Sequence, residues 1–347
     1  GLSGGKVPKG TVKKVRAHLP LALEKYKFQV ENLKRICGEK IVEHLRSLKD
    51  FHQESEDGEY NSQMMGEYLN LHLLGHISPK IDYRVRQRLN KKVFDERNMF
   101  NATDFMYVNW QATDRWSLMA GKQTVLIGGY EYDAAPIDVY YYSQFCNNIY
   151  QCFTFGVSAT YKFLPEQNLV AQVCNSPLSL GFQSIYAYNL AWSGQFAPWW
   201  HTIWSVNIVE DQDKRPVNYI SLGNRWTFGG VLLDLDVMNR AGLSQSGFLG
   251  TDMSFISKFI WSVGNWNICS KGGYEFNNAR NVDSKGRAYD LVIAPGTEYF
   301  YIGAGLEWFP LSKDNLRLHA VYYKDNSARK HNLEIGVTWR ADIIGGK

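Results

Sequence analysis

Apolar and polar residues alternate one by one along most of the chain after residue 67. Leu69, Leu71 and Leu73 are separated by Asn70 and His72. Similar alternation covers 153–163 and 333–340, and it returns near 104–112, 203–209, 219–227, 231–240, 299–309 and 316–323. Because successive side chains of a strand point to opposite faces, each run predicts a strand with one apolar and one polar face.

Two all-β architectures fit such strands. A soluble sandwich turns the apolar faces inward against each other, whereas a transmembrane barrel turns them outward to lipid. The spacing of the strands favours the barrel, because tight turns such as Ser78-Pro79-Lys80 and Gly229-Gly230 alternate with longer connections such as 125–151 and 277–296. Short turns on one side of a membrane and long loops on the other are typical of outer-membrane barrels.

The number of strands is also constrained. About fifteen runs follow Glu67. If the short turns lie on the periplasmic side, both the first and the last of these strands run toward the periplasm. A barrel with both termini on that side needs one more ascending strand before Tyr68. We therefore expect an antiparallel barrel of about 16 strands, with the first strand somewhere within residues 1–66.

The N-terminal part has a different pattern. Apolar residues from Leu23 to Leu48 recur at spacings of three and four, which predicts an amphipathic helix. Glu54 to Gly58 is interpreted as a polar linker, and the chain is divided into residues 1–60, a helical or first-strand segment, and residues 61–347, the barrel. The helix is either a plug, a periplasmic contact or a partner-binding element, or it simply packs against the barrel.

Composition excludes several classes of protein. No stretch offers the roughly 18 to 20 consecutive apolar residues of a membrane-spanning helix. The net charge of +4 argues against a nucleic-acid binder. The first residues lack the apolar core of a signal peptide, so the chain is expected to be cytoplasmic or already processed. Its five cysteines have no zinc-ligand spacing; either Cys146 and Cys152 form a bridge or all five are unpaired thiols.

Several strings resemble the phosphate-selective porin O and P family of Gram-negative outer membranes, in the branch typical of anaerobic gut and oral bacteria. They are Ala102-Thr-Asp-Phe-Met-Tyr-Val-Asn-Trp-Gln-Ala-Thr-Asp-Arg-Trp-Ser-Leu-Met-Ala-Gly-Lys-Gln, Gly129-Tyr-Glu-Tyr-Asp-Ala-Ala-Pro, Ala187-Tyr-Asn-Leu-Ala-Trp, Tyr219-Ile-Ser-Leu-Gly-Asn-Arg-Trp and the stretch from Leu316 to Arg340. The resemblance covers residues 60–340 in order. It implies a 16-stranded porin, a removed secretory signal, and phosphate or polyphosphate as solutes.

A row of arginines is the most informative local motif. Arg84, Arg86 and Arg88 share one face of a predicted strand. An arginine facing lipid near the midplane would cost about 2 to 4 kcal/mol, so we expect all three to face the lumen. At a rise of about 3.4 Å per residue they would form a ladder spaced about 7 Å apart, able to pass anions between bidentate sites.

Because alternate side chains of a strand share one face, the other predicted strands also place charged residues on the face that lines the lumen. They are Lys162, Arg225, Arg240, Lys258, Lys271, Arg317, Arg340, Asp234, Asp236, Glu307 and Glu334, together with Glu275. The wall is therefore mixed, with a basic excess. These charges either give the pore a mild anion preference, or they pair with one another across the lumen and create a transverse field with little selectivity.

Aromatic residues suggest two further features. Nine of them are predicted to form an interfacial girdle near the strand ends: Trp110, Trp116, Trp199, Trp200, Trp204, Trp261, Trp266, Tyr299 and Trp308. The run Tyr140, Tyr141 and Tyr142 in the longest loop is a candidate constriction loop that narrows the mouth. The alternative is that the same loop binds sugars or a partner at the surface.

The sequence thus predicts a multi-pass porin of the cell outer membrane for passive diffusion of small hydrophilic solutes, leaning toward anions or phosphate. Its partners would be outer-membrane lipid, those solutes, and a homo-trimer or other outer-membrane proteins; no nucleic acid, cofactor or metal is expected. The alternative is a non-conducting barrel that anchors surface proteins. Scattered histidines without a GxSxG or HExxH string argue against an enzyme.

Overall fold

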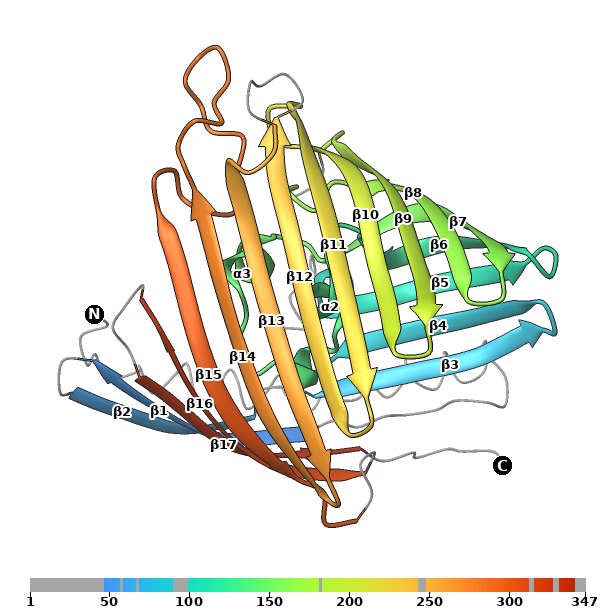
Figure 1. Cartoon of the computed structure of the whole chain (residues 1–347). Helices are drawn as coiled ribbons and strands as arrows, with labels where there is room; N and C mark the ends of the chain where they lie inside the picture. The colour runs from blue at the N-terminus through green and yellow to red at the C-terminus, as the bar shows by residue number, and fades with distance from the viewer. Residues whose placement is uncertain are drawn as a thin grey trace, which may run out of the picture.

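A computed structural model describes residues 47–56, 59–66, 69–89, 99–180, 183–242, 248–311, 315–326 and 331–340. It is all-β, and in this part of the chain seventeen strands form one sheet (Figure 1). They are β1 (Ser47–Glu56), β2 (Glu59–Gly66), β3 (Asn70–Ser78), β4 (Ile81–Arg88), β5 (Thr103–Gln111), β6 (Trp116–Thr124), β7 (Phe153–Leu164), β8 (Gln167–Asn175), β9 (Tyr186–Ala197), β10 (Trp200–Glu210), β11 (Pro216–Phe228), β12 (Val231–Gly242), β13 (Asp252–Val263), β14 (Trp266–Asn277), β15 (Glu298–Trp308), β16 (Leu316–Asp325) and β17 (His331–Trp339).

The pairing of the strands makes a barrel wall. Consecutive strands from β3 to β17 pair antiparallel, and β1 pairs antiparallel with both β17 and β2. Because every pairing from β3 through β17 to β1 and β2 is antiparallel, strand direction reverses at each step. β2 and β3 therefore run in the same direction. They are consecutive in the chain, and β2 pairs with β1 while β3 pairs with β4. Counted as one interrupted strand, they give the wall sixteen strands.

This arrangement confirms the predicted barrel and locates its first strand. The strands after Glu67 number fifteen, and the expected earlier strand is β1 at Ser47–Glu56. The interpretation of Glu54 to Gly58 as a linker is wrong for its first three residues, which belong to β1. Leu48 also lies in β1 rather than in a helix. The rest of the predicted N-terminal helix, with Cys37, lies outside the described residues, as do most of residues 1–60.

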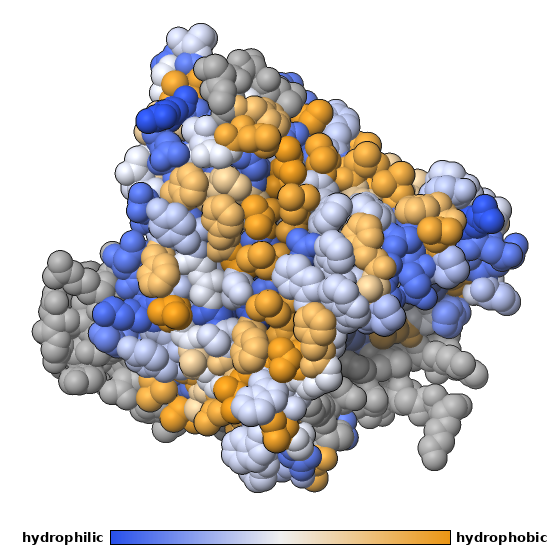
Figure 2. All heavy atoms as spheres, in the orientation of Figure 1, coloured by the Kyte–Doolittle hydropathy of each residue, from blue (hydrophilic) through white to orange (hydrophobic). Residues whose placement is uncertain are grey.

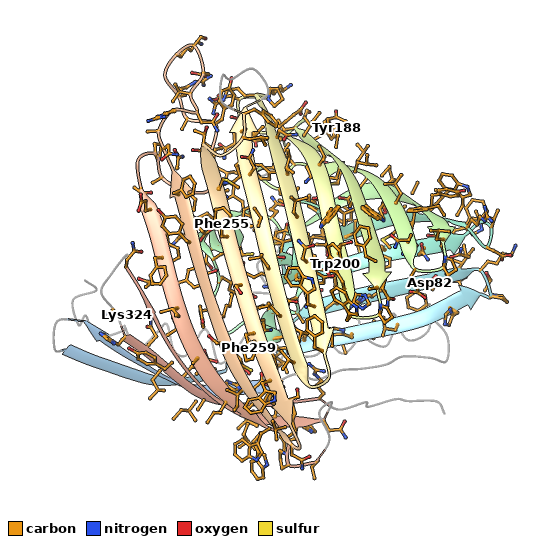
Figure 3. The ribbon with its side chains drawn as sticks, in the orientation of Figure 1. Asp82, Tyr188, Trp200, Phe255, Phe259 and Lys324 are labelled. Carbon is orange, nitrogen blue, oxygen red and sulfur yellow. The ribbon has the colours of Figure 1, made fainter. Side chains whose placement is uncertain are left out.

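The two faces of the wall have the polarity that the sequence predicts. On β13, Asp252 and Ser254 are buried toward the inside, whereas Phe255 and Phe259 are exposed on the outside (Figure 3). Over the central strands the outer surface is largely apolar (Figure 2). Only a membrane makes such an exterior favourable, because contiguous apolar patches of this size are rare on soluble proteins.

Tryptophans gather near the short turns. Trp266 of β14 stacks on Trp308 of β15, with ring centroids 5.8 Å apart, and Trp199 stacks on Phe228 at 5.3 Å. Six of the predicted girdle residues are exposed and Trp200 and Trp204 are half-buried. Tyr299 is the exception: its hydroxyl donates to Asp325 and its ring packs on inward-facing Tyr301, so its assignment to the girdle is wrong. In the described part of the chain no helix is both long and apolar enough to cross a membrane.

Most connections sort by length as expected. The exceptions are residues 57–58, which join β1 to β2 at the end of the longer connections, and residues 309–315, which join β15 to β16 at the end of the shorter ones. Residues 79–80, 165–166, 198–199, 229–230 and 264–265 form short turns at one end, which we call the short-turn end. The opposite, long-loop end carries 125–152, 176–185 and 278–297. The connection 125–152, here called the inserted segment, does not stay outside the barrel. Its helices α2 (Tyr130–Asp133) and α3 (Gln144–Asn148) lie inside the curve of the sheet, behind β12–β14 (Figure 1).

An apolar cluster fills part of the barrel interior. It joins three groups of buried residues: Val125, Ile127, Phe145 and Ile149 of the inserted segment; Val209, Val217, Tyr219, Met238 and Ile256 of β10–β13; and Tyr289, Val292 and Ile293 of the loop 278–297. The expectation of a wholly polar inner face is therefore wrong here. Two loops that fold inward bring apolar faces of their own, and these are buried best against apolar wall residues.

Candidate functional site

The inserted segment begins its first helix against the wall. Backbone N–H groups of Tyr130 and Glu131 donate to the Asp236 carboxylate of β12, over 2.9 and 2.8 Å. A side chain at Gly129 would place its Cβ 2.2 Å from an Asp236 oxygen, so glycine is what permits this approach. The carboxylate also lies at the positive end of the helix, where negative charge is favourable. Asp236 thus fixes the start of α2.

The start of α3 is held in the same way. Glu275 of β14 accepts from the backbone N–H groups of Gln144 and Phe145, over 2.6 and 3.0 Å. Ser143 caps the helix by accepting from the N–H of Cys146 at 3.1 Å. Two wall carboxylates therefore position both helices of the inserted segment, and neither is left as a free charge in the lumen.

Glu131 links the two helices to a wall cation. Its carboxylate pairs with Lys271 of β14 and accepts from the N–H of Ser143 at 3.0 Å. Burial alone would raise the pKa of Glu131, but the Lys271 charge and hydrogen bonds from Lys271, Ser143 and Cys146 together lower it. The group is therefore a buried carboxylate that stays ionised.

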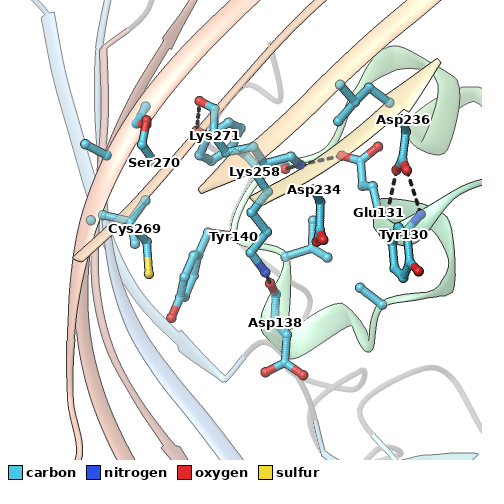
Figure 4. Close-up of a pocket in the computed structure, with 18 of the residues that line it drawn as sticks. Tyr130, Glu131, Asp138, Tyr140, Asp234, Asp236, Lys258, Cys269, Ser270 and Lys271 are labelled. Carbon is cyan, nitrogen blue, oxygen red and sulfur yellow. Dashed lines mark hydrogen bonds and ion pairs between the residues drawn. The ribbon is translucent and has the colours of Figure 1, made fainter. Parts of the chain in front are cut away.

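A second anchor surrounds Asp138, which ends the short 3-10 helix Pro136–Asp138. Its carboxylate lies 3.0 Å from Nη1 of Arg317 and 3.4 Å from Nη2 of Arg340, and its backbone oxygen accepts from Lys258 at 2.9 Å. Arg317 also lies 3.2 Å from Glu307. Figure 4 shows Lys258 and Lys271 reaching this part of the inserted segment from the wall.

The three consecutive tyrosines take different positions. The Tyr140 hydroxyl donates to Glu307, and burial raises the pKa of this phenol, which favours its role as a donor. Tyr141 donates to the backbone oxygen of Lys271 at 2.6 Å and stacks on Tyr323, with centroids 4.4 Å apart. Tyr142 is half-buried and lines a cavity on the opposite side of the segment. The run thus lies inside the barrel rather than over its surface.

The predicted arginine row lies on β4, with part of its charge compensated. Arg86 and Arg88 both donate through Nε to one Asp104 oxygen, each over 2.8 Å. The guanidinium carbons of Arg84 and Arg86 both lie 4.3 Å from the Phe105 ring centroid. Among the described residues, Arg84 has no carboxylate partner. The ladder is therefore not three equal sites: Arg86 and Arg88 share one carboxylate, whereas Arg84 forms no ion pair with a described residue.

The remaining predicted pore-lining charges are distributed along the inner wall. Arg225 pairs with Asp234 at 2.6 Å and covers the Tyr130 ring at 4.1 Å. His319 pairs with Glu334 at 3.1 Å. Lys162 is exposed near the short-turn end.

Arg240 is fully buried and does not line a water-filled path. It pairs with Asp290 of the loop 278–297 at 2.9 Å and donates to Ser254 at 2.6 Å. Most of the predicted wall charges thus hold inserted loops or pair with neighbours on the wall, instead of facing each other across an empty lumen.

The sequence analysis did not identify several residues that form ion pairs inside the barrel. Glu131, Asp138 and Asp290 lie in long connections without any period of apolar residues, so nothing in their surroundings indicates which way they point. Asp104 lies within a predicted strand, and its role depends on a neighbouring strand. A pairing register would have revealed it: β4 and β5 are paired with Arg86 opposite Phe105.

Two cavities flank the inserted segment. A small one of about 50 Å³ separates it from β11–β16 and is shown in Figure 4. A larger one of about 650 Å³ lies on its other side, toward β4–β7, where Arg88, Asp104 and Lys122 face Tyr132 and Tyr142. The larger cavity also reaches Ser179 and Leu180 of the β8–β9 connection, so it lies toward the long-loop end.

The described cysteines are all free thiols: Cys146, Cys152, Cys174 and Cys269. The proposed bridge between the first two is therefore wrong for this structure, and the alternative of unpaired thiols holds for these four. Within the described ranges, no group of three or more His, Cys, Asp or Glu side chains is arranged to hold a metal ion.

Comparison with known proteins gives a family match and a fold. The model of the family phosphate-selective porin O and P matches residues 47–202. No curated protein sequence matches the chain.

Among solved structures, the anion-selective porin from Comamonas acidovorans has a TM-score of 0.56 and 11% identity, covering 86% of this chain and 98% of that chain. OmpT of Vibrio cholerae in its trimer form has a TM-score of 0.55 and 10% identity, covering 86% and 98%. At such identities the likeness shows the fold. The chain therefore has the fold of outer-membrane porins, and over residues 47–202 it matches the family of phosphate-selective porins O and P.

Proposed function

We propose that this outer-membrane barrel is a diffusion porin whose path runs between the β4 arginines and the inserted segment. The observation that carries the proposal is the asymmetry of the interior. On the β10–β16 side the inserted segment is bonded to the wall and packed in the apolar cluster. On the β4–β7 side a cavity of about 650 Å³ separates it from the wall. Among the described residues, this is the largest space beside the inserted segment, and a cavity of about 230 Å³ lies next to Tyr130 toward β8–β10.

The charges along that path support a mild anion preference. Arg88, Lys122 and Asp104 line the cavity itself. With Arg84 and Arg86 on the same strand as Arg88, they give four positive charges against the carboxylates of Asp82, Asp104 and Asp133 in this part of the described chain. Asp82 already accepts from Asn109 at 3.0 Å, near the short-turn end. Asp133 lies on α2 within the field of Arg84. The excess of one positive charge is small, so we expect selectivity between ions to be weak and graded.

The constriction is formed by the inserted segment. Its helices are bonded to the wall by Asp236, Glu275, Lys271 and Arg317, so that its position is set by buried ion pairs. A segment held by so many charged contacts stays in place while solutes pass. We propose no enzymatic activity, and we propose a homo-trimer as the assembly, as in the trimer form of OmpT; chemical cross-linking in detergent tests the latter.

Liposome swelling tests passive diffusion. Vesicles that contain the purified barrel should swell in small neutral sugars, at rates that fall steeply from monosaccharides to trisaccharides, because the path is narrowed on one side. Protein-free vesicles are the control. Absence of swelling, together with absence of ionic current in a planar bilayer, would contradict the porin proposal and favour a closed barrel that anchors surface partners.

A further inference from the structure

The larger cavity has the chemistry of a binding site as well as of a passage. Cationic side chains stand on one side of it: Arg88 of β4 and Lys122 of β6 both line it. Arg88 is held in place by Asp104 at 2.8 Å, so the position of its guanidinium is fixed before any ligand arrives. Such fixed cations favour phosphate or carboxylate groups.

The other sides of the cavity carry aromatic rings. Tyr132 and Tyr142 come from the inserted segment, Tyr150 follows α3, and Phe153 begins β7. Packing sets the positions of two of these rings: the ring centroid of Tyr132 lies 5.9 Å from that of Phe145 of the apolar cluster, and that of Phe153 lies 5.0 Å from that of Phe105. Rigid aromatic surfaces beside a water-filled space offer contact area to flat apolar faces at a low entropic cost.

Amide and carboxylate groups complete the lining. Asn147 and Gln151 stand between the rings, and Gln151 donates to the Ser179 backbone oxygen at 2.9 Å. The amide nitrogen of Asn147 likewise donates to the Tyr142 backbone oxygen at 3.4 Å. The amide oxygens are therefore the groups that hydroxyl groups of a ligand would bond, and an aromatic acid has no hydroxyl groups to donate to them. Asp104 adds a carboxylate that can accept hydrogen bonds. A bare inorganic anion would use the cations and neither the rings nor the amides.

We infer that this cavity is a binding site for an anionic sugar, with its acidic group toward Arg88 and Lys122 and its ring against the tyrosines. The inference rests on the proposed function, since the sugar would enter by the diffusion path. The size agrees, because sites for small organic ligands have volumes of roughly 300 to 1,000 Å³. The site would concentrate such solutes at the long-loop end before they pass the constriction.

Isothermal titration calorimetry on the full chain, folded in detergent, tests the inference without requiring any current. The three probes are glucose 6-phosphate, glucose and inorganic phosphate. Because the site would use both the acidic group and the ring, glucose 6-phosphate should bind at least about tenfold more tightly than either of the others. Equal affinity for glucose 6-phosphate and inorganic phosphate, or no binding of glucose 6-phosphate, would overturn the inference.

Variants at Tyr150 separate a sugar site from simple electrostatic attraction. Tyr150 is 51% exposed, so its removal should leave the fold intact. Tyr150→Ala should weaken glucose 6-phosphate binding roughly three- to tenfold and leave phosphate binding unchanged, whereas Tyr150→Phe should stay within about twofold of the parent. The matched control is Tyr186→Ala, which removes a tyrosine that is 41% exposed on the outer face. Equal effects of Tyr150→Ala and Tyr186→Ala would contradict the site.

The two proposals fail in different ways. If the barrel conducts and swells vesicles but shows no preference for glucose 6-phosphate in the calorimeter, only the sugar site is wrong. If the barrel binds glucose 6-phosphate but passes neither ions nor sugars, the diffusion function is wrong and the cavity is a receptor site on a closed barrel.

Discussion

Lys271 of β14 donates its ammonium group to the carboxylate of Glu131, 140 positions earlier in the chain, inside the barrel. Both side chains are nearly fully buried. Glu131 also donates its backbone N–H to Asp236 and accepts from Ser143, which precedes the Glu275 contact of α3, so the pair connects both anchored helices to the wall. Its charge state therefore controls how firmly the segment is held.

Acid should break the Glu131 contact only below the ordinary pKa of a glutamate side chain, about 4.5. The pKa of Glu131 is lowered in the folded protein, so its stabilising effect is fully present above the ordinary value and is lost as the pH falls through the lowered one. We expect the difference in single-channel noise between the parent and Glu131→Gln to stay constant from pH 7 down to the ordinary value, and to shrink below it as Glu131 of the parent becomes protonated.

Glu131→Gln provides the control for this acid response. It removes one partner of a buried ion pair, which costs about 3 to 5 kcal/mol, so its channels should be noisy already at neutral pH. It should also show a smaller acid response than the parent. A difference between the parent and Glu131→Gln that shrinks already above the ordinary glutamate pKa, or one that persists unchanged in acid, would contradict this role.

Asp236→Asn should weaken the start of α2 without changing its shape. The carboxylate accepts two backbone N–H groups, and an amide is a weaker acceptor that carries no charge for the helix end. We expect a loss of about 1 to 3 kcal/mol, seen as faster protease cleavage within 130–148. Asp114→Asn, in an exposed short turn, is the control and should leave the cleavage rate unchanged.

Arg84 should carry more of the ion preference than its neighbours, because among the described residues it lacks a carboxylate partner. A unit charge about 7 Å from a permeating ion in a water-like medium contributes about 0.6 kcal/mol, or about threefold in relative permeability. Arg84→Ala should lower the anion-to-cation permeability ratio by up to that factor. Lys324→Ala, on the outer face, should leave it unchanged; a similar fall in both variants would remove Arg84 from the path.

The buried pair of Arg240 and Asp290 should stabilise the loop 278–297 inside the barrel. Asp290→Asn leaves a fully buried guanidinium without its counter-charge, which costs about 3 to 5 kcal/mol. We expect a lower unfolding temperature on a heat-modifiability gel. Because the double variant Arg240→Met/Asp290→Leu removes both charges, it should lose less stability than Asp290→Asn; a larger loss would contradict the ion-pair explanation.

The wall of the barrel could be predicted from the sequence because alternate residues of its strands face lipid on one side and the interior on the other, which gives a pattern that repeats every two residues. Leu69 to Leu73 and 153–163 show that period plainly. β1 escaped assignment because Leu48 and Phe51, its two large apolar residues, are three positions apart, as in a helix. Its place in the wall follows from backbone pairing with β17 and β2, which no single segment reveals.

The interior could be predicted only in part. The alternation of side chains placed Arg84, Arg225 and Lys271 on the inner face, because charged side chains avoid lipid. The alternation does not tell what an inward charge will contact. Glu131 and Asp138 come from a connection that has no period, and their partners Lys271 and Arg317 are more than 130 residues away. The apolar cluster was unexpected for the same reason: Ile256 and Met238 break the polar face only where an inserted loop covers them.

The central claim is that a weakly cationic path runs through the barrel beside the inserted segment. The reversal potential of a single purified channel, measured in a planar bilayer under a tenfold gradient of potassium chloride, tests it most directly. We expect a small reversal potential with the sign of the chloride equilibrium potential, and a smaller one in Arg84→Ala. A reversal potential with the sign of the potassium equilibrium potential would contradict the proposed cationic path.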